Sequence, residues 1–408
     1  MTSTVMTAVR RQILRVVAWA LLAAPASVPV WAQQGSVEKV TLAVISVEGD
    51  PRYEARRTER AYPGHPVSRA VEGARLGVED SAFELDVEGK ALEVRDVVLA
   101  RPSHLPRTLA ALRKEGVHHI IADLPSYMMQ DLVKRAPVML DGAIVFNTGL
   151  ADDVLRGGAC APHLLHTYPS QAMLYDGLAQ YLSSKSWRNA LVLNGSKPAD
   201  AALASAFERS AKRYGIKVVQ EKPFKLSGDP RERDLGNVRL LTSERTHEVV
   251  AVMDADGEFA RTVPYATQMP RPVVGANGLV PLAWHPQWER FGGPQLSRRF
   301  LRQTGQLMRG QDWASWMAAR AMATVLVEHP KANVQEQLQA LRSGAVRLDG
   351  FKGKALSFRS WNGQLRQPVF LTHVDGVVAA APIDGVLHPK EVMDTLGLDE
   401  QENACKTP

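Results

Sequence analysis

The sequence predicts an α/β protein of two lobes, each built on a mainly parallel β-sheet with helices on both faces. Short apolar runs alternate with amphipathic segments between residues 37 and 146, and this alternation is typical of parallel strands joined by helices. The same alternation begins again after residue 166. A chain of 408 residues is also longer than one hydrophobic core usually covers, so two lobes are expected.

Residues 1–32 have the features of a cleaved secretory signal peptide. Three arginines precede an apolar stretch from Val16 to Val30, and small residues precede the predicted cleavage site at Ala32. The stretch contains prolines and is shorter than the roughly 20 apolar residues that span a bilayer. We therefore expect a soluble mature protein in the periplasm. Loss of these arginines lowers the formal charge from +6 to +3, which argues against nucleic acid as a partner.

The first half of the mature chain alternates strands and helices. Val37 to Glu48 reads as an apolar-rich first strand, and a polar loop from Gly49 to His65 follows it. Apolar spacing and turn residues then place a helix over 67–83, a strand over 92–99, a helix over 105–114, a strand over 118–122 and a strand over 143–146. This order predicts the first parallel sheet.

The stretch from Cys160 to Gly195 marks the passage into the second lobe. Leu174, Leu178 and Leu182 recur at helical spacing, and a short apolar run then ends in an Asn-Gly turn. Beyond it we expect helices over 198–214, 235–242, 294–308, 312–327 and 334–341, and strands over 190–193, 216–220, 249–253, 272–278, 354–358 and 368–374. The second lobe therefore repeats the architecture of the first.

Polar residues follow several of the predicted strands. Ligands of parallel α/β sheets bind at the carboxyl ends of the strands, so Asp123, Ser126, Asn147 and Thr148 are expected to contact a ligand. Ser126 and Thr148 also stand where helices begin, and free N–H groups there favour anions. The strand over 249–253 is followed by the acidic loop 254–258, which favours a cationic solute instead.

The sequence lacks the common catalytic motifs. It contains no G-x-S-x-G, no H-E-x-x-H, no phosphate-binding loop and no G-x-G-x-x-G after the first strand. Cys160, His163 and His166 have a spacing that could suit a metal, but they enter an extended crossing in which three ligands need not converge. We therefore expect neither an enzyme nor a metal site. Cys160 and Cys405 either form one disulfide or stay separate thiols.

Three longer segments carry a family resemblance. They are the crossover HTYPSQAMLYDGLAQYL, the helix DWASWMAARAMATVL and the tail LDGFKGKALSFRSWNGQLRQPVFL. Together with the order of elements they resemble type I periplasmic solute-binding proteins of ABC importers, in particular those for branched-chain amino acids. The resemblance implies two Rossmann-like lobes, a hinge of three crossings and a ligand held between the lobes. It covers nearly the whole mature chain.

A narrower resemblance concerns the ligand. The loop DPRYEARRTERAYPGHP and the segment LSFRSWNGQLRQP look like the subgroup associated with pyrroloquinoline quinone (PQQ)-dependent alcohol dehydrogenase systems. One branch of that subgroup is understood to bind PQQ itself, so the resemblance implies PQQ as the bound ligand and no catalytic cofactor. The loops that hold the ammonium and carboxylate of amino acids in other members differ here.

The residues can be compared with what PQQ requires, which is a stacking surface and several cationic donors. Arginine binds carboxylates through two parallel hydrogen bonds, and Arg56 and Arg57 stand beside Tyr53 in the loop after the first strand. Trp284 and Trp288 follow the return crossing, where they could clamp a flat ring. The remaining expected ligand contacts are His166, Tyr168 and Asn277.

The predicted organisation follows from these observations. The first lobe comprises residues 37–166 and 284–343, the second comprises 167–278 and 348–383, and 384–408 form a C-terminal tail. We expect a monomer that captures PQQ and delivers it to an ABC permease or to a PQQ-dependent dehydrogenase system. Two alternatives stay open, namely a binding protein for an amino acid or an aromatic acid, and a ligand-free interaction or sensory module of an alcohol dehydrogenase system.

Overall fold

A computed structural model describes residues 37–53 and 64–405. Its first sheet has five parallel strands in the order β2-β1-β3-β4-β5. The strands are β1 (Glu38–Val47), β2 (Lys90–Leu99), β3 (His119–Asp123), β4 (Ile144–Asn147) and β5 (Leu164–His166). The alternation of strands and helices therefore produces the predicted parallel sheet.

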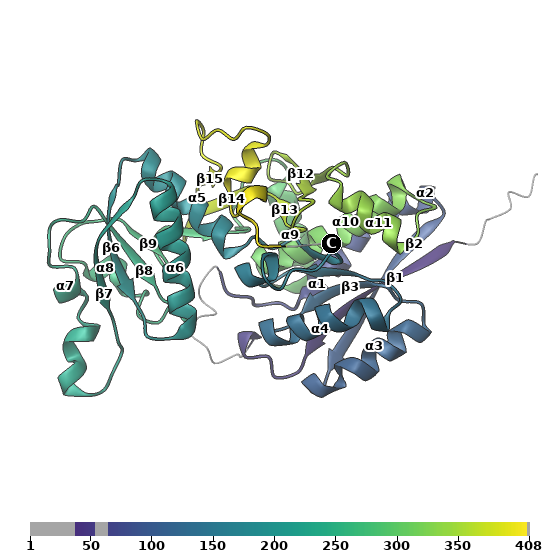
Figure 1. The fold of residues 1–408 in the computed structure, drawn as a ribbon, viewed down its shortest axis with the longest axis horizontal. Coiled ribbons are helices and arrows are strands. Elements are labelled where there is room, and N and C mark those ends of the chain that lie inside the picture. Colours follow the sequence, from purple (N-terminus) through teal and green to yellow (C-terminus); the bar gives the residue numbers. More distant parts are fainter. Residues whose placement is uncertain (1–36, 54–63, 406–408) are drawn as a thin grey trace, which may run out of the picture. The chain divides into compact units, whose positions relative to one another are not determined.

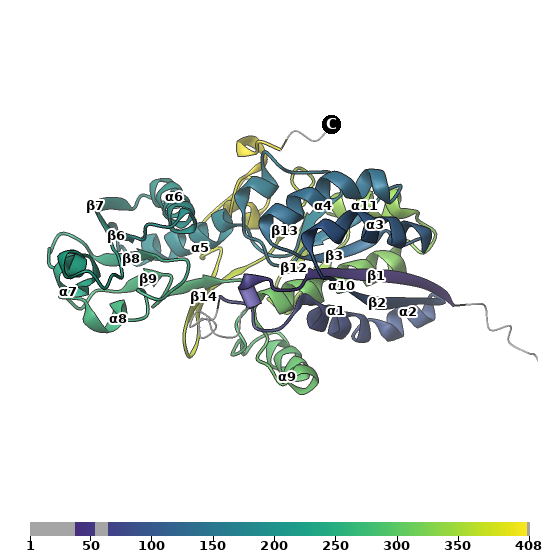
Figure 2. The ribbon, with the colours of Figure 1, turned by 90° about the horizontal axis from the view of Figure 1, so that it is seen from below.

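Helices cover both faces of this sheet because successive side chains of a strand point to opposite sides. Leu42 and Val44 of β1 pack into one cluster with helices α1 (Ala70–Glu79) and α10 (Gly310–Glu328). Ala43 and Ile45 pack into a second cluster with α3 (Leu105–Lys114) and α4 (Ser126–Met139). Figure 2 shows α1 along one side of the sheet and α3 and α4 along the other.

The second sheet has four parallel strands in the order β7-β6-β8-β9. They are β6 (Asn189–Asn194), β7 (Lys217–Pro223), β8 (Val249–Met253) and β9 (Val273–Gly275). One face packs against α5 (Gln171–Ser184) and α6 (Pro198–Arg213), and the other packs against the short helices α7 (Val238–Leu241) and α8 (Val263–Ala266). Figure 1 shows α6 and α7 beside this sheet.

Two small antiparallel sheets complete the fold. One pairs β10 (Val280–Leu282), β14 (Val369–His373) and β15 (Gly376–Ala381), and the other pairs β11 (Leu348–Asp349), β12 (Ala355–Phe358) and β13 (Leu365–Arg366). Their strands come from distant parts of the chain. Leu348, Leu356 and Phe358 lie in the same cluster as Leu42 and Val44, so this part of the predicted second lobe packs with the first sheet.

Several expected helices differ in their bounds. The helix expected over 67–83 is two helices, because the side chain of Ser81 turns back to Gly77 O at 2.7 Å and α2 (Ala82–Val87) begins after it. The helix expected over 294–308 is α9 (Gly293–Thr304), which ends where Gly305 takes a φ of 69°. The chain also forms α11 (Val334–Arg342), close to its predicted bounds. No helix in the described ranges 37–53 and 64–405 is both long and apolar enough to cross a bilayer.

Candidate functional site

A pocket of about 290 Å³ lies where the strand ends of both parallel sheets converge. Gly149 follows β4 and Tyr168 follows β5 in the first sheet. The loop 254–257 follows β8, and Gly275 is the last residue of β9 in the second sheet. The carboxyl ends of parallel strands are the usual place for ligands in such sheets. The pocket is therefore the candidate ligand site.

Further residues complete the wall of the pocket. They come from the segment before α1, from the loops after β4 and β9, from α5, α6, β10 and the start of α10, and they are Gly64, His65, Ala151, Gln171, Leu174, Tyr175, Leu203, Ala276, Val280, Pro281, Leu282 and Gln311. The wall thus combines apolar side chains with two phenols, two carboxamides and one imidazole. This mixture suits a small organic molecule with both apolar and polar groups.

The charged side chains of the wall are acidic. Asp254 is buried, and burial raises the pKa of its carboxyl group even though its Oδ2 accepts a hydrogen bond of 2.9 Å from the N–H of Ala260. Asp256 forms an ion pair with Lys197. Among the described residues that line the pocket there is no lysine or arginine. The described part of the wall thus carries two carboxyl groups, one of which is paired with Lys197.

The two phenols of the wall are neutral at physiological pH. Burial raises the pKa of Tyr168 to about 12, and burial also raises the pKa of Tyr175. The hydroxyl of Tyr175 lies 3.4 Å from the sulfur of Met253, at the end of β8. Both rings therefore offer aromatic surface without adding charge. Twelve residues are expected to contact a ligand. Among those that the structure describes, Tyr168 lines this pocket and the others do not.

Asn147 and His166 bond to their own surroundings. The Asn147 Nδ2 donates to Leu150 O at 2.7 Å and lies 3.0 Å from Nδ1 of His166, while its Oδ1 accepts from the N–H of Leu150 at 2.9 Å. Asn147, His166 and Thr148 are each at most 1% exposed. Their polar groups shape the turn that brings Gly149 to the pocket, and ligand contact by them stays a prediction.

Tyr53 and Asp123 belong to a network of charges beside the pocket. The Tyr53 hydroxyl donates to Asp123 Oδ1 at 2.8 Å, and Arg52 donates to the same oxygen at 3.1 Å. Arg52 also pairs with Asp50 at 2.6 Å, and the guanidinium of Arg69 lies 4.0 Å from the centre of the Tyr53 ring. Two carboxylates and two guanidinium groups thus compensate one another at the ends of β1 and β3.

Ser126 and Asn277 stand at element ends, as expected. Ser126 is the first residue of α4 and is partly exposed. Asn277 follows β9, where its Nδ2 donates to Ala260 O at 3.1 Å and its Oδ1 accepts from the N–H of Gly278 at 2.8 Å. Neither residue lines the pocket, so their contact with a ligand remains untested.

Trp284 and Trp288 pack inside the protein. Trp284 is 0% exposed, and its ring stacks on Trp313 with centroids 6.1 Å apart. Trp288 packs on Phe370 at 4.5 Å, and its Nε1 donates to Phe351 O at 2.9 Å. Large aromatic side chains contribute most to stability when they are buried. These tryptophans therefore support the β10 crossing rather than the pocket lining.

Arg56 and Arg57 lie outside the described residues. The segment that contains them, 54–63, directly precedes Gly64 and His65, which line the pocket.

The described residues show no cluster of ligands for a metal ion. Cys160 is bonded to Cys405 in a disulfide, which decides between the two alternatives left by the sequence. The His163 Nε2 lies 2.9 Å from Val133 O, and burial lowers the pKa of this imidazole. Of these three residues, Cys160 thus forms a disulfide, and His163 and His166 are buried.

Sequence reasoning did not single out Gln171, Tyr175 and Gln311 as pocket residues. Gln171 and Tyr175 stand in the first two turns of α5, directly after the crossing, and Gln311 stands in the first turn of α10. The acidic loop 254–258 after β8, in contrast, is expected from the sequence to face a possible cleft, and its residues Asp254 to Gly257 line the pocket.

Comparison with known proteins identifies the fold. No family model and no curated protein matches the sequence. A substrate-binding protein of an ABC transporter from Sphaerobacter thermophilus is 15% identical, with a TM-score of 0.66 over 85% of this chain and 98% of that chain. This is the type I periplasmic-binding-protein fold.

Two further solved structures share the type I fold. An amino acid ABC transporter substrate-binding protein from Pseudomonas fluorescens Pf-5 is 12% identical, with a TM-score of 0.65 over 85% of this chain and 96% of that chain. A solute-binding protein from R. palustris in complex with benzoate is 11% identical, with a TM-score of 0.60 over 90% of this chain and 99% of that chain. At these identities the similarity concerns the fold.

Proposed function

We propose that this protein captures a small solute in the pocket formed by the strand ends of its two parallel sheets. The observation that carries the proposal is the position of Gly149, Tyr168 and the loop 254–257, which bring both sheets to one cavity. A ligand held by both sheets favours one arrangement of them, and a partner that recognises this arrangement detects the bound state. The partner we propose is an ABC permease, and the proposed location is the periplasm. No covalent chemistry is required.

The ligand that we put forward first is PQQ. Its support is the sequence resemblance and the closeness in sequence of Arg56 and Arg57 to Gly64 and His65, which line the pocket. Guanidinium groups from this segment would pair with the carboxylates of PQQ. Tyr168 and Tyr175 offer aromatic surface for a flat ring system.

An amine-bearing solute is a second candidate, and a specific observation favours it. Asp254 and Asp256 line the pocket, and carboxylates in a cleft attract cationic groups. Asp254 is 6% exposed, so an ammonium group beside it would be shielded from water and would lower the raised pKa of the carboxyl. Leucine and benzoate are useful probes because structures with this fold contain them.

Equilibrium titration distinguishes these ligands. The mature protein is titrated with PQQ, leucine and benzoate in parallel, and tryptophan fluorescence and heat are followed. PQQ capture predicts saturable one-to-one binding that weakens at least about tenfold in Arg56→Ala/Arg57→Ala, since each charge-assisted bond contributes about 1.5–3 kcal/mol. The matched control is Arg298→Ala, an exposed arginine of α9 outside the pocket lining. Binding of leucine alone, weakened by Asp254→Asn, would replace PQQ by an amine-bearing solute.

A further inference from the structure

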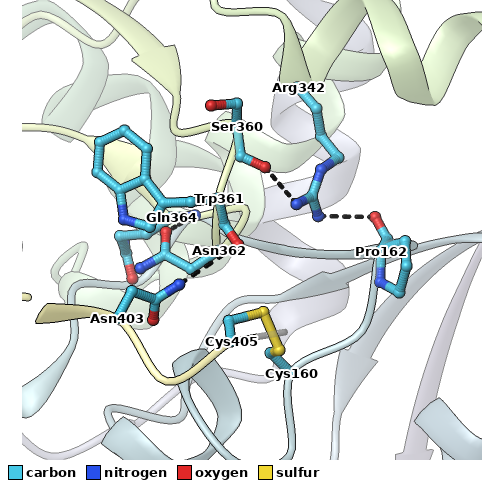
Figure 3. The surroundings of a disulfide bond; sticks show 9 residues. All are labelled: Cys160, Pro162, Arg342, Ser360, Trp361, Asn362, Gln364, Asn403 and Cys405. Carbon is cyan, nitrogen blue, oxygen red and sulfur yellow. Dashed lines mark hydrogen bonds between the residues drawn. A yellow bond between two sulfur atoms is a disulfide. The ribbon is translucent and has the colours of Figure 1, made fainter. Parts of the chain in front are cut away.

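The C-terminal segment 383–405, here called the strap, runs from the end of β15 to the disulfide between Cys405 and Cys160. The two cysteines are 245 residues apart in the sequence. Cys160 lies in the loop between the 3-10 turn Asp153–Arg156 and β5 of the first sheet. Figure 3 shows the bond between the strap and this loop. One end of the strap is thus covalently attached to the lobe of the first sheet.

The middle of the strap is attached to helices of the second sheet. The Gly397 N–H donates to Asp176 Oδ2 of α5 at 2.7 Å, and the Tyr214 hydroxyl at the end of α6 donates to Thr395 O at 2.6 Å. The Gln180 Nε2 of α5 donates to Thr395 Oγ1 at 3.2 Å. Asp176 is 0% exposed, so its bond to the strap is shielded from water. The strap therefore holds α5 and α6 through specific polar contacts.

A buried ion pair fixes the same part of the strap to the β12–β13 hairpin. Arg359 Nε donates to Asp394 Oδ1 at 2.8 Å, and Arg366 Nε donates to the same oxygen at 2.9 Å. Arg359 also donates to Leu396 O at 2.7 Å and is only 1% exposed. The hairpin contributes Phe358 to the cluster around the first sheet. The strap thus links the two parallel sheets twice, once through this ion pair and once through the disulfide.

The disulfide is the part of this linkage that chemistry can reverse. Cys160 and Cys405 are both partly exposed, whereas Arg359 and Asp394 are buried. Near the disulfide, the strap makes an exposed ion pair between Glu402 and Arg213 of α6 at 3.3 Å, and a weak hydrogen bond from Asn403 Nδ2 to Trp361 O at 3.5 Å. On the side of the first sheet, the last residues of the strap are therefore held mainly by the disulfide.

We propose that Cys160–Cys405 is a thiol–disulfide exchange site that sets how firmly the strap ties the two parallel sheets together. A dithiol reductant attacks one sulfur, the S–S bond breaks, and a mixed disulfide forms. The second thiol of the reductant then releases the other cysteine. Two electrons pass from the dithiol, which becomes a disulfide, to Cys160 and Cys405, which become thiols. Of the two links, the disulfide is then broken and the ion pair at Asp394 remains.

This proposal does not depend on which solute the pocket binds. In the oxidised protein, movement of α5 and α6 relative to the first sheet has to stretch both links. In the reduced protein it has to stretch only the ion pair and the neighbouring hydrogen bonds of Arg359, so local opening of the strap becomes more frequent. The disulfide therefore couples the thiol–disulfide balance of the surroundings to how freely α5 and α6 move relative to the first sheet.

Hydrogen exchange of the full-length mature protein tests the proposal. Reduction with dithiothreitol is expected to speed amide exchange in residues 391–405 at least about tenfold, while β1 and α10 keep their protection. The Cys405→Ser variant without reductant should exchange like the reduced wild type, and adding reductant to it should change nothing. Identical exchange of this segment in the oxidised and reduced wild type would overturn the proposal.

A second variant tests the two links as a pair. Asp394→Asn weakens the ion pair and keeps the disulfide, so the oxidised variant should exchange only moderately faster in residues 391–405. Reduction of this variant should accelerate exchange by a larger factor than reduction of the wild type, because the disulfide is then lost and only neutral hydrogen bonds, such as that from Arg359 to Leu396 O, still join the strap to the hairpin. Small-angle X-ray scattering should then show a broader range of sizes. If reduction accelerated exchange by the same factor in the wild type and in Asp394→Asn, and scattering did not change, the disulfide would restrain nothing beyond its own loop.

Discussion

Asn147 and His166 are paired residues on the adjacent parallel strands β4 and β5, and the Asn147 amide nitrogen lies 3.0 Å from the His166 Nδ1. Both side chains are 0% exposed. Asn147 also closes the turn to Leu150 with both its amide nitrogen and its oxygen. The pair therefore shapes the strand ends from which Gly149 and Tyr168 reach the pocket.

Replacing Asn147 tests this structural role. Asn147→Ala leaves Leu150 N–H and His166 Nδ1 without their partner in a buried place, so the free energy of unfolding should fall by about 2–4 kcal/mol. Urea denaturation measures this change. Asn237→Ala, which removes a cap on the exposed side of α7, should cost only about 1 kcal/mol. Similar losses in the two variants would contradict the role of Asn147.

Buried histidines should make the protein acid-sensitive. Burial lowers the pKa of His119 to about 4, and its Nε2 lies 2.8 Å from Gln337 Oε1. Because the unfolded chain binds this proton already near pH 6.5, stability is complete above that pH and falls as the pH drops toward 4. The loss due to His119 is roughly 3 kcal/mol. Urea midpoints between pH 7.5 and 4.5 should fall less steeply for His119→Gln than for the wild type.

Asp312 should act in the opposite direction. Burial raises the pKa of its carboxyl to about 7, although its Oδ2 accepts a hydrogen bond of 2.8 Å from the N–H of Arg309. A raised carboxyl pKa contributes stability that is complete below about pH 4 and is lost as the pH rises through 7. Asp312→Asn removes this loss. In urea denaturation, the free energy of unfolding of the variant minus that of the wild type should rise by about 2–4 kcal/mol between pH 5 and pH 8. The same difference at both pH values would refute the raised pKa of Asp312.

Two glycines permit close contact between α1 and α10. A methyl group at Gly77 would lie 2.6 Å from Trp316 O, and one at Gly73 would lie 2.3 Å from Asp312 O. Gly77→Ala should therefore lower the free energy of unfolding by about 2–3 kcal/mol. Gly228→Ala is the matched control, because open space surrounds that position. A thermal unfolding scan that finds the two variants equally stable would show that the helices can move apart without cost.

The α/β fold could be predicted because its main elements are long and periodic. The strand from Glu38 to Val47 and the helix from Gly310 to Glu328 lie close to the ranges that apolar spacing indicates. The helix from Ser126 to Met139 received no predicted bounds, and it contains Pro137, a residue that usually ends helices. The pairing of β10 with β14 joins residues about 90 positions apart, and no local pattern encodes such a contact.

The site could be predicted only in part. The rule that ligands bind at strand ends predicts contacts at Tyr168 and points to the loop after β8, and both line the pocket. The rule does not say where a side chain points. Asp123 is the last residue of β3, yet it lies between Tyr53, Arg52 and Arg69, since buried polar groups need partners. Two tryptophans at a crossing suggested a clamp, but aromatic side chains at that place fill the core just as well.

The most direct test of PQQ capture in this pocket is a titration of the mature protein with PQQ after the pocket has been filled by mutation. Leu203 lines the pocket, whereas Leu240 is 48% exposed on α7 and does not. PQQ capture in this pocket predicts one-to-one binding to the wild type and to Leu240→Trp, and binding weakened at least about tenfold in Leu203→Trp. Equal binding to all three proteins would place the ligand elsewhere. Absence of binding of PQQ, leucine and benzoate to the folded wild type would contradict the solute-capture proposal for all three probes.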